Sequence, residues 1–318
     1  MILYQNWLVC NTRPTARLKF EITKLDAKPA PTVTEFSSRG PSPTFPSVLK
    51  PDIMGPGFRI LTTWPVHVQA QSSYFQDLYT SFNLLTGTSM ACPHLDGVAT
   101  LIKKAHPDWS PAAIRSAMMT TSDAVDHSGQ PIQDSGPDQS PTTGFDMGAG
   151  QVSPNKALEP GLVYDLNSSD YVNLLCAMNF TTAQIRAITR SHHSTGSCNN
   201  ICATPSLDLN YPSFIANFAA DRSNQVLEFR RTLTNVGCEM ATYKASVTSF
   251  DGLEVRVVPT VLAFKAKGDM LGFKLVIEYA MKKMRNPFLK LGYLRWIEVG
   301  GGNHVVQSPI VATNMNSL

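Results

Sequence analysis

The C-terminal part of the chain consists of short runs rich in Val, Phe, Tyr, Leu and Thr, and turn residues separate one run from the next. Several runs alternate polar and apolar residues, as in Lys244-Ala245-Ser246-Val247, which is the period of a half-buried β-strand. About seven such strands at this spacing predict an antiparallel β-sandwich. The expected strands are Val226–Val236, Ala241–Ser249, Leu253–Val258, Val261–Lys265, Leu271–Tyr279, Leu289–Val299 and His304–Thr313.

The part of the chain before these strands mixes helix patterns with loops rich in Gly, Pro, Ser and Thr, which is typical of an α/β domain. We therefore predict two domains, an α/β domain in residues 1–205 and a β-sandwich in residues 206–318. One predicted helix has Pro93 in its first turn, where no backbone donor is required. Its apolar residues recur at helical spacing and form one face: Leu95, Val98, Ala99, Ile102 and Ala105.

Two further helices are signalled by their first residues. One begins at Ser110-Pro111, a preferred N-cap followed by proline at the first helical position. A weaker pattern predicts a helix that follows Ser168 and continues to Ala177.

Charge and hydropathy give no sign of a nucleic-acid or membrane partner. The 318 residues include 27 Lys and Arg and 24 Asp and Glu, for a net charge of +3, and no basic run stands out. No stretch approaches the roughly 20 apolar residues that span a bilayer. The N-terminal residues lack the basic and apolar regions of a signal peptide, so we expect either an intracellular protein or a true start that lies upstream.

The cysteines are too sparse for a disulfide-built scaffold, and no paired CxxC spacing suggests zinc. Cys176, Cys198 and Cys202 cluster, so one local disulfide can form among them, although buried or idle thiols are an equally open interpretation. We expect no cofactor, and the sequence neither indicates nor excludes a structural calcium site.

The segment from Thr86 to His94 bears most directly on function. Gly87 permits a tight turn, and Ser89 lies where the chain enters the helix that contains Leu95. At a helix N-terminus, unpaired backbone N–H groups and the positive end of the helix dipole stabilise an oxyanion that develops near the hydroxyl. The alternative is a plain N-cap, because serine in front of a helix usually has only that structural role.

Gly87-Thr88-Ser89-Met90-Ala91-Cys92-Pro93-His94 resembles the nucleophile motif of subtilisin-like proteases, and the wider sequence resembles the plant branch, the subtilases. The resemblance covers nearly the whole chain. It implies a subtilisin-like α/β domain, with a parallel sheet and helices, followed by a fibronectin type III-like sandwich. The other matching segments, in the family's order, are Phe36–Pro41, Leu49–Ile53, Ala105–Ala117, Gly148–Gly150, Pro160–Asp165, Asp208–Ser213 and Arg231–Gly237.

The family cleaves peptide bonds with a Ser-His-Asp triad, and the resemblance makes Ser89 the nucleophile. In this family the triad Asp and His precede the serine in the chain. The only upstream histidine, His67, stands in no His-Gly-Thr-His context, and we interpret it as a surface residue of a variable loop. The upstream aspartates Asp26, Asp52 and Asp77 stand in no Asp-Thr-Gly context, and the Ala-Gly-Asn context of the oxyanion-hole asparagine is absent.

The chain thus carries a nucleophile without its triad partners, and we predict negligible protease activity for it alone, because a serine hydroxyl without a base is a poor nucleophile. His94 is not the base in this family, and Asp52 is expected to make structural hydrogen bonds. The resemblance also implies that the N-terminal half of the catalytic domain, with most of its sheet, is missing. The Leu95–Ala105 face should therefore have little to bury against. Asp96 in the same helix is expected either to be exposed or, if it faces the sheet, to cost stability.

The resemblance also implies a protein or peptide substrate, an extracellular or apoplastic full-length protein, and a homodimer in some family members. Asn167-Ser168-Ser169 and Asn179-Phe180-Thr181 are glycosylation sequons that fit an extracellular origin without establishing it. A disulfide from Cys176 to Cys198 or Cys202 would suit the same oxidising compartment.

Three accounts of the chain are open. The favoured one is a truncated product or incomplete gene model of a plant-type subtilase. The second is a short protein that has lost catalysis and binds a partner through its β-sandwich, which an exposed apolar patch with a polar rim would favour. The third is an enzyme that a separate N-terminal chain completes in trans.

Overall fold

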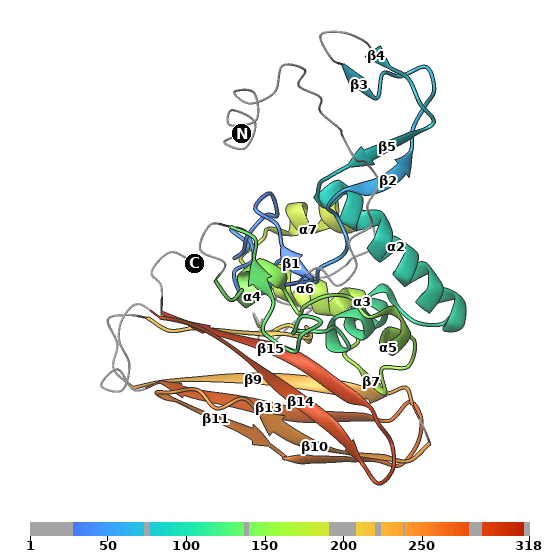
Figure 1. Cartoon of the computed structure of the whole chain (residues 1–318). Coiled ribbons are helices and arrows are strands. Elements are labelled where there is room, and N and C mark those ends of the chain that lie inside the picture. Colours follow the sequence, from blue (N-terminus) through green and yellow to red (C-terminus); the bar gives the residue numbers. More distant parts are fainter. Residues whose placement is uncertain are drawn as a thin grey trace.

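The computed structural model describes residues 28–72, 77–136, 140–190, 208–219, 224–237, 239–279 and 288–314. A β-sandwich occupies the lower part of Figure 1, and the helices lie against one side of it. Strands β2 to β5 extend away from the helices at the top of the same view. Within the described part of the chain, no helix has the length and hydropathy to span a bilayer.

The β-sandwich confirms the predicted architecture of the C-terminal part. One sheet has the order β12-β10-β14-β15-β8, and the other has the order β11-β13-β9-β7. Within these two sheets β8 and β15 pair in parallel, and the other neighbours are antiparallel. The strands are β7 Leu162–Val163, β8 Phe214–Asn217, β9 Gln225–Asn235, β10 Ala241–Val247, β11 Leu253–Val258, β12 Val261–Phe264, β13 Met270–Tyr279, β14 Leu289–Val299 and β15 Val305–Thr313.

Strands β9 to β15 lie where the sequence predicts them, and their ends differ by no more than two residues. Strands β7 and β8 were not predicted, because they have only two and four residues and their buried side chains do not alternate with exposed ones. Although β7 comes from the part assigned to the first domain, it pairs with β9 and extends the smaller sheet. The domain boundary after residue 205 falls outside the described residues and stays a prediction.

Large aromatic side chains fill the space between the two sheets. Trp296 and Tyr243 are fully buried, and the ring of Phe273 meets Trp296 edge-on with the centroids 5.1 Å apart. Further buried apolar residues from both sheets join them in one continuous cluster. Removal of this much apolar surface from water is the main source of the sandwich's stability.

Side chains that precede β8 complete the free edge of β9. The amide oxygen of Asn210 accepts a hydrogen bond from the Thr232 backbone N–H at 2.8 Å, and its Nδ2 donates to the Thr232 carbonyl at 3.0 Å. Asn210 therefore takes the place of a neighbouring strand at this position. Because an uncovered strand edge tends to pair with other chains, this contact also protects β9.

Arg231 ties the same two segments together from inside. Its buried guanidinium forms an ion pair with Asp208 and donates to the carbonyl oxygens of Tyr211 at 3.0 Å and Ser213 at 3.2 Å. It also lies 4.8 Å from the centre of the Phe214 ring. A buried guanidinium is stable only when its donors are paired, so the segments from Asp208 and from Arg231 form one structural unit.

Six helices are described in the remaining part of the chain. The Ser110 side chain accepts a hydrogen bond from the Ala113 N–H at 3.0 Å, as predicted for the N-cap of α3. Helix α7 was not predicted, although Thr181 and Gln184 form a capping box that the sequence signals. The helices are α2 Thr88–Ala105, α3 Pro111–Thr120, α4 Gly144–Met147, α5 Pro154–Leu158, α6 Ser168–Ala177 and α7 Thr182–Thr189.

Helix α2 differs from its prediction at the N-terminus. The helix begins at Thr88, so Pro93 lies inside it and the prediction that Pro93 occupies the first turn is wrong. Proline has no N–H, so the carbonyl of Ser89, four residues earlier, has no intrahelical hydrogen bond from that position. The helix thus includes the proposed nucleophile in its first turn.

The apolar face of α2 is better covered than expected. Val98 and Ile102 are buried against a cluster that includes Ile114 of α3 and Ala157 of α5, so the expectation that this face has little to bury against is wrong for these two residues. Leu101, however, is 58% exposed on another side of the helix. Asp96 is exposed, which is one of the two expected outcomes.

The predicted parallel sheet is represented by very few residues among those described. Strand β1, Thr32–Val33, pairs in parallel with β6, Gln133–Asp134, and a single parallel bridge joins Met54 to Gln151. The described chain therefore contains an α/β part with mixed strand pairing beside the β-sandwich.

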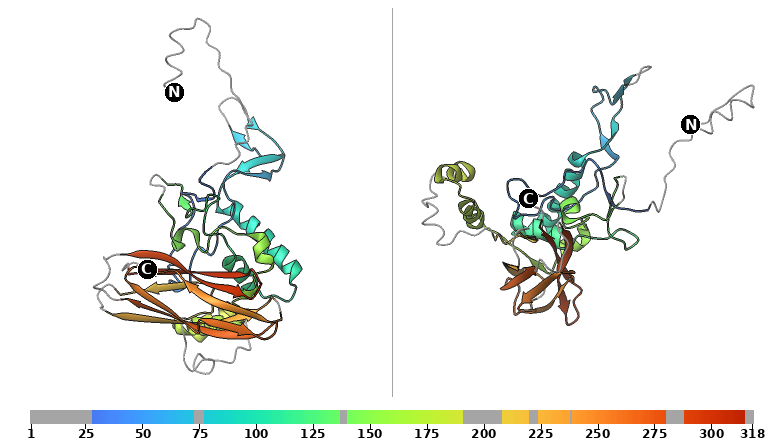
Figure 2. Two further views of the ribbon diagram at one scale, coloured as in Figure 1. Left: turned by 60° about the horizontal axis from the view of Figure 1, so that its bottom comes forward. Right: turned by 90° about the vertical axis from the view of Figure 1, so that its left-hand side faces the viewer.

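Four short strands form a projection that we call the arm. Strand β2, Ile60–Thr63, pairs with β5, Phe82–Leu85, and β3, Gln71–Ser72, pairs with β4, Asp77–Leu78, both in antiparallel fashion. Both views of Figure 2 show the arm extending from the N-terminal end of α2 and away from the sandwich.

Candidate active site

A close approach between two glycines precedes Ser89. The N–H of Gly87 donates to the carbonyl of Gly57 at 2.9 Å, and a Cβ atom on Gly57 would lie 2.8 Å from the Gly87 carbonyl oxygen. A side chain at position 57 would therefore push the two segments apart. Next to this contact, the hydroxyl of Thr86 accepts a hydrogen bond from the Arg59 N–H at 2.9 Å. These contacts hold the turn that leads into α2.

Ser89 lies in the first turn of α2 and is exposed. The helix has 18 residues and carries no acidic side chain in its first turn, so nothing there offsets the positive end of its dipole. The first backbone N–H groups of a helix have no intrahelical acceptor. The arrangement can therefore stabilise negative charge beside the Ser89 hydroxyl.

Neither histidine near Ser89 in the sequence is placed to act as its base. The Nδ1 atom of His94 donates to the Met90 carbonyl at 2.8 Å, one turn back along the same helix. His67 is exposed in the arm, in a turn closed by a hydrogen bond of 2.9 Å from the Val68 N–H to the Pro65 carbonyl. Among the described residues, no histidine is hydrogen-bonded to the Ser89 hydroxyl.

The upstream aspartates do not gather at Ser89 either. Asp26 lies outside the described residues, and Asp77 is in β4 of the arm, where it accepts a hydrogen bond from Gln69 at 2.5 Å. Asp52 forms an ion pair of 2.7 Å with Lys50 and accepts a hydrogen bond from the Tyr211 hydroxyl. These contacts agree with the structural role expected for Asp52.

Tyr211 is the centre of the cluster that contains Asp52. The guanidinium carbon of Arg115 lies 4.6 Å from the centre of the Tyr211 ring. A guanidinium nitrogen of Arg115 also donates a hydrogen bond to the Tyr171 hydroxyl at 3.0 Å. Burial, and then the charge of Asp52, raise the pKa of Tyr211 well above its usual range. Burial lowers the pKa of Arg115, but Tyr211 and Tyr171 raise it, and the net change is upward. The cluster links the segment before the arm to the segment that leads into β8.

Cys176 is disulfide-bonded, which agrees with a disulfide in the Cys176 cluster. Cys198 and Cys202 lie outside the described residues, so the choice between them is still a prediction. Cys92, near Ser89, is an exposed free thiol.

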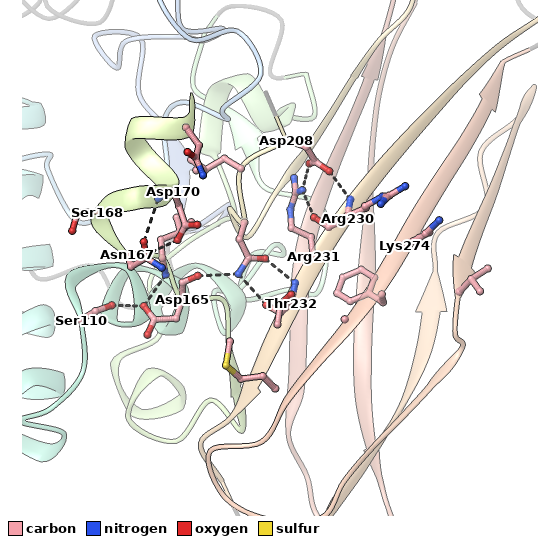
Figure 3. Close-up of a pocket in the computed structure, with 18 residues that line it drawn as sticks. Ser110, Asp165, Asn167, Ser168, Asp170, Asp208, Arg230, Arg231, Thr232 and Lys274 are labelled. Atoms are coloured by element: carbon pink, nitrogen blue, oxygen red, sulfur yellow. Dashed lines mark hydrogen bonds and ion pairs between the residues drawn. The ribbon is translucent and has the colours of Figure 1, made fainter. Parts of the chain in front are cut away.

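Sequence analysis did not identify one pocket of the described structure, beside helix α6. It has a volume of about 970 Å³ and lies between the N-terminus of α6 and strands β9 and β13. Figure 3 shows Asp165, Asn167 and Asp170 on its helical side and Arg230 and Lys274 on its strand side. No motif signals this pocket, because its walls come together only when the α/β part meets the sandwich.

Comparison with known proteins assigns most of the chain to two family models. The model described as "Subtilase family" matches residues 5–150, and the model described as "Fibronectin type-III domain" matches residues 208–312. Solved structures that align with this chain are only weakly similar to it. The alignment with the periplasmic chaperone SfaE covers 33% of this chain at 7% identity, with a TM-score of 0.24.

Curated relatives match nearly the whole chain. "Subtilisin-like protease SBT3" of Solanum lycopersicum is 46% identical over 97% of this chain and 40% of its own length. "Subtilisin-like protease SBT1.5" of Arabidopsis thaliana is 41% identical over 96% of this chain and 39% of its own length. The chain therefore spans about 40% of the length of these relatives. On these matches it belongs to the subtilase family, over a region that includes the fibronectin type III-like domain.

Proposed function

We propose that this chain is the C-terminal region of a serine endopeptidase and that Ser89 is its nucleophile. The observation that carries the proposal is the position of Ser89, exposed in the first turn of α2 within the Gly87–His94 motif. In this role the Ser89 hydroxyl attacks the carbonyl carbon of a peptide, and the N-terminus of α2 stabilises the resulting oxyanion.

The chain alone lacks what this reaction needs. A general base must accept the hydroxyl proton, and within the described residues no imidazole is bonded to Ser89. We infer that the triad Asp and His, and the oxyanion-hole Asn, belong to family segments that precede the region matched here. Members of a triad act as a unit, so the loss of two lowers turnover nearly as much as the loss of all three. The isolated chain is therefore inactive.

The nucleophile is tested in a chimera in which this chain replaces the matching region of the tomato relative. The chimera should cleave a fluorogenic peptide, and Ser89→Ala should reduce its kcat by a factor of about 10³ or more. The matched control is Thr88→Ala, which changes the neighbouring hydroxyl and should leave most of the rate. A chimera that is folded and equally active with Ser89→Ala would refute the role of Ser89.

The full-length protein of this proposal acts outside the cell on proteins or peptides. The two relatives described above, both subtilisin-like proteases of plants, support the substrate class. The disulfide at Cys176 supports an oxidising compartment. Secretion of the full-length transcript product, followed with an antibody against the sandwich, tests the location.

A second candidate function is partner binding through the sandwich, and one surface feature favours it. Val261, Lys244, Ile297 and Val305 face one another across β12, β10, β14 and β15. The three apolar members are 39–46% exposed, and Lys244 lies among them. If the purified chain retains a partner, Ile297→Lys should abolish the binding. Val226→Lys, on the other sheet, is the control and should leave the binding unchanged.

A further inference from the structure

Helix α6 begins at an asparagine that the sequence places in a glycosylation sequon. Asn167 is the N-cap of the helix, and its Oδ1 atom accepts hydrogen bonds from the backbone N–H groups of Ser169 at 2.8 Å and Asp170 at 3.2 Å. The Asp170 carboxylate accepts the Asn167 N–H at 2.8 Å in return. This capping box fixes the position of the Asn167 side chain.

The cap uses only the oxygen of the Asn167 carboxamide. In the described part of the chain, its Nδ2 atom donates no hydrogen bond, and the residue is exposed. An N-linked sugar replaces one hydrogen of Nδ2 and leaves Oδ1 as an acceptor. Glycosylation at Asn167 is therefore compatible with the cap.

Asn167 also lines the pocket of about 970 Å³ beside α6, as Figure 3 shows. The nearby wall consists mainly of hydrogen-bond acceptors and hydroxyl groups from Asp165, Ser168 and Asp170. A group rich in hydroxyl and amide donors would complement this wall.

We propose that Asn167 carries an N-linked glycan and that its first N-acetylglucosamine lies in this pocket. The proposal rests on the secreted location in the proposed function, but it does not depend on catalysis by Ser89. The hydroxyl and acetamide groups of the sugar can donate hydrogen bonds to the carboxylates of Asp165 and Asp170 and can pair with the Ser168 hydroxyl.

The modification itself is a group transfer from a lipid diphosphate-linked oligosaccharide, catalysed by the host's transferase as the chain enters the secretory lumen. Nδ2 of Asn167 attacks the anomeric carbon of the oligosaccharide. The new N–C bond forms as the bond from that carbon to the diphosphate oxygen breaks. Nδ2 loses one proton, and the carrier leaves as the lipid diphosphate.

The second sequon provides a contrast. Asn179 is also exposed, but it has a φ of 60° in the turn between α6 and α7, and the Thr181 hydroxyl of its sequon caps α7. Asn179→Gly removes this sequon and suits the left-handed backbone. This background leaves Asn167 as the one natural acceptor sequon in the sequence.

The experiment secretes the whole chain, with Asn179→Gly, from cells that make only high-mannose glycans. A cleavable signal peptide directs entry, and an added C-terminal acceptor sequon reports that the lumen was reached. Ser169→Ala removes the Asn167 sequon but keeps the N-cap, because the cap uses the Ser169 backbone. Ser168→Ala is the matched control, since it changes a neighbouring serine and keeps the sequon.

Intact mass measures occupancy. We expect one glycan at Asn167 with the wild-type sequence and with Ser168→Ala, and none with Ser169→Ala. A chain whose added sequon is glycosylated and whose Asn167 is bare would overturn the proposal. Ser89→Ala should give the same glycan mass, so a failure here is distinct from a failure of the protease assignment.

Contact with the pocket is measured after endoglycosidase H has trimmed the glycan to one N-acetylglucosamine. We expect this form to melt about 2 °C above the Ser169→Ala form, since one or two added hydrogen bonds raise Tm by this order in a domain of this size. Equal melting temperatures would show that the sugar extends into solvent, and the pocket assignment would be wrong.

Discussion

The sandwich and the arm use β-strands in different ways. In the sandwich, β9, β13 and β14 have 10 or 11 residues, and large side chains such as Trp296 are fully buried between two sheets. In the arm, β2 and β5 have four residues each and pair only with one another among the described strands. Apolar side chains on both remain in solvent, with Leu61 67% and Leu84 62% exposed. The sandwich has a core of its own, and the arm does not.

This difference bears on function because Ser89 follows the arm directly. An apolar strand pair that faces water is typical of a surface made to contact another polypeptide. The region matched here is about 40% of the relatives' length, so the relatives have further chain that can cover such a surface. The comparison predicts that changes in the sandwich core unfold the chain, whereas equivalent changes in the arm do not.

Trp296→Ala should have the largest effect. The side chain is fully buried, and truncation of a buried tryptophan costs about 3–5 kcal/mol through lost burial and the cavity left behind. Phe82→Ala in the arm, where the ring is 54% exposed, should cost no more than about 0.5 kcal/mol. Urea unfolding, followed by far-UV circular dichroism, measures the free-energy cost of both substitutions. A similar cost for the two variants would contradict the comparison.

Arg231→Met should have the next largest effect, about 2–3 kcal/mol, because Asp208 and the carbonyls of Tyr211 and Ser213 lose a charged donor. Arg256→Met is the matched control, since Arg256 is 56% exposed and pairs with Glu278 at the surface. Its cost should lie below about 1 kcal/mol in the same urea experiment. If the two costs were equal, Arg231 would not tie its two segments together.

High pH should act on the buried tyrosines. Burial, opposed in part by a hydrogen bond with Ser308, raises the pKa of Tyr164 to about 12, against about 10 in the unfolded chain. The folded state therefore holds its phenol proton more tightly, and stability is lost as pH rises from 10 to 12. At pH 11 this loss is on the order of 1 kcal/mol.

The check is Tm measured from pH 8 to pH 11. Burial also raises the pKa of Tyr293 to about 12, so the wild-type chain should lose stability through both residues. Tyr164→Phe should flatten the pH dependence, whereas Tyr79→Phe in the arm, 56% exposed, should leave it unchanged. An identical decline with Tyr164→Phe would mean that this hydroxyl is not buried.

Asp96→Ala should have the smallest effect, within about 0.5 kcal/mol, because the carboxylate is exposed on α2. Ile102→Ala on the buried face of the same helix should cost about 2–5 kcal/mol and serves as the positive control. A large cost for Asp96→Ala would show that this side of α2 is covered in the isolated chain.

The sequence predicted the sandwich closely because its strands are long and alternate, as in Met270–Tyr279, where inward residues from Phe273 onward are buried. It failed where pairing depends on distant partners. Leu162–Val163 becomes a strand only because Asn235 and Thr234 of β9 lie beside it. The predicted start of α2 is wrong because a proline is common in the first turn of a helix, whereas this helix already begins at Thr88 and contains Pro93.

For the candidate site, the sequence identified the Ser89 motif and its helix, since both are local. It could not identify the pocket beside Asn167, whose walls come from Asp165, Asp170 and Lys274 on separate elements. Nor could local pattern reveal that Tyr211 holds Asp52 in place, because these residues meet only through the tertiary fold.

The most direct test of the account is the reaction of the purified chain with a fluorophosphonate probe, read by intact mass with Ser89→Ala as the control. Because no base is bonded to Ser89 in the described structure, we expect no adduct on a chain that circular dichroism shows to be folded. An adduct that disappears with Ser89→Ala would mean that a base reaches this hydroxyl in the isolated chain. The account of an incomplete active site would then be wrong, and His67 would be the first residue to replace.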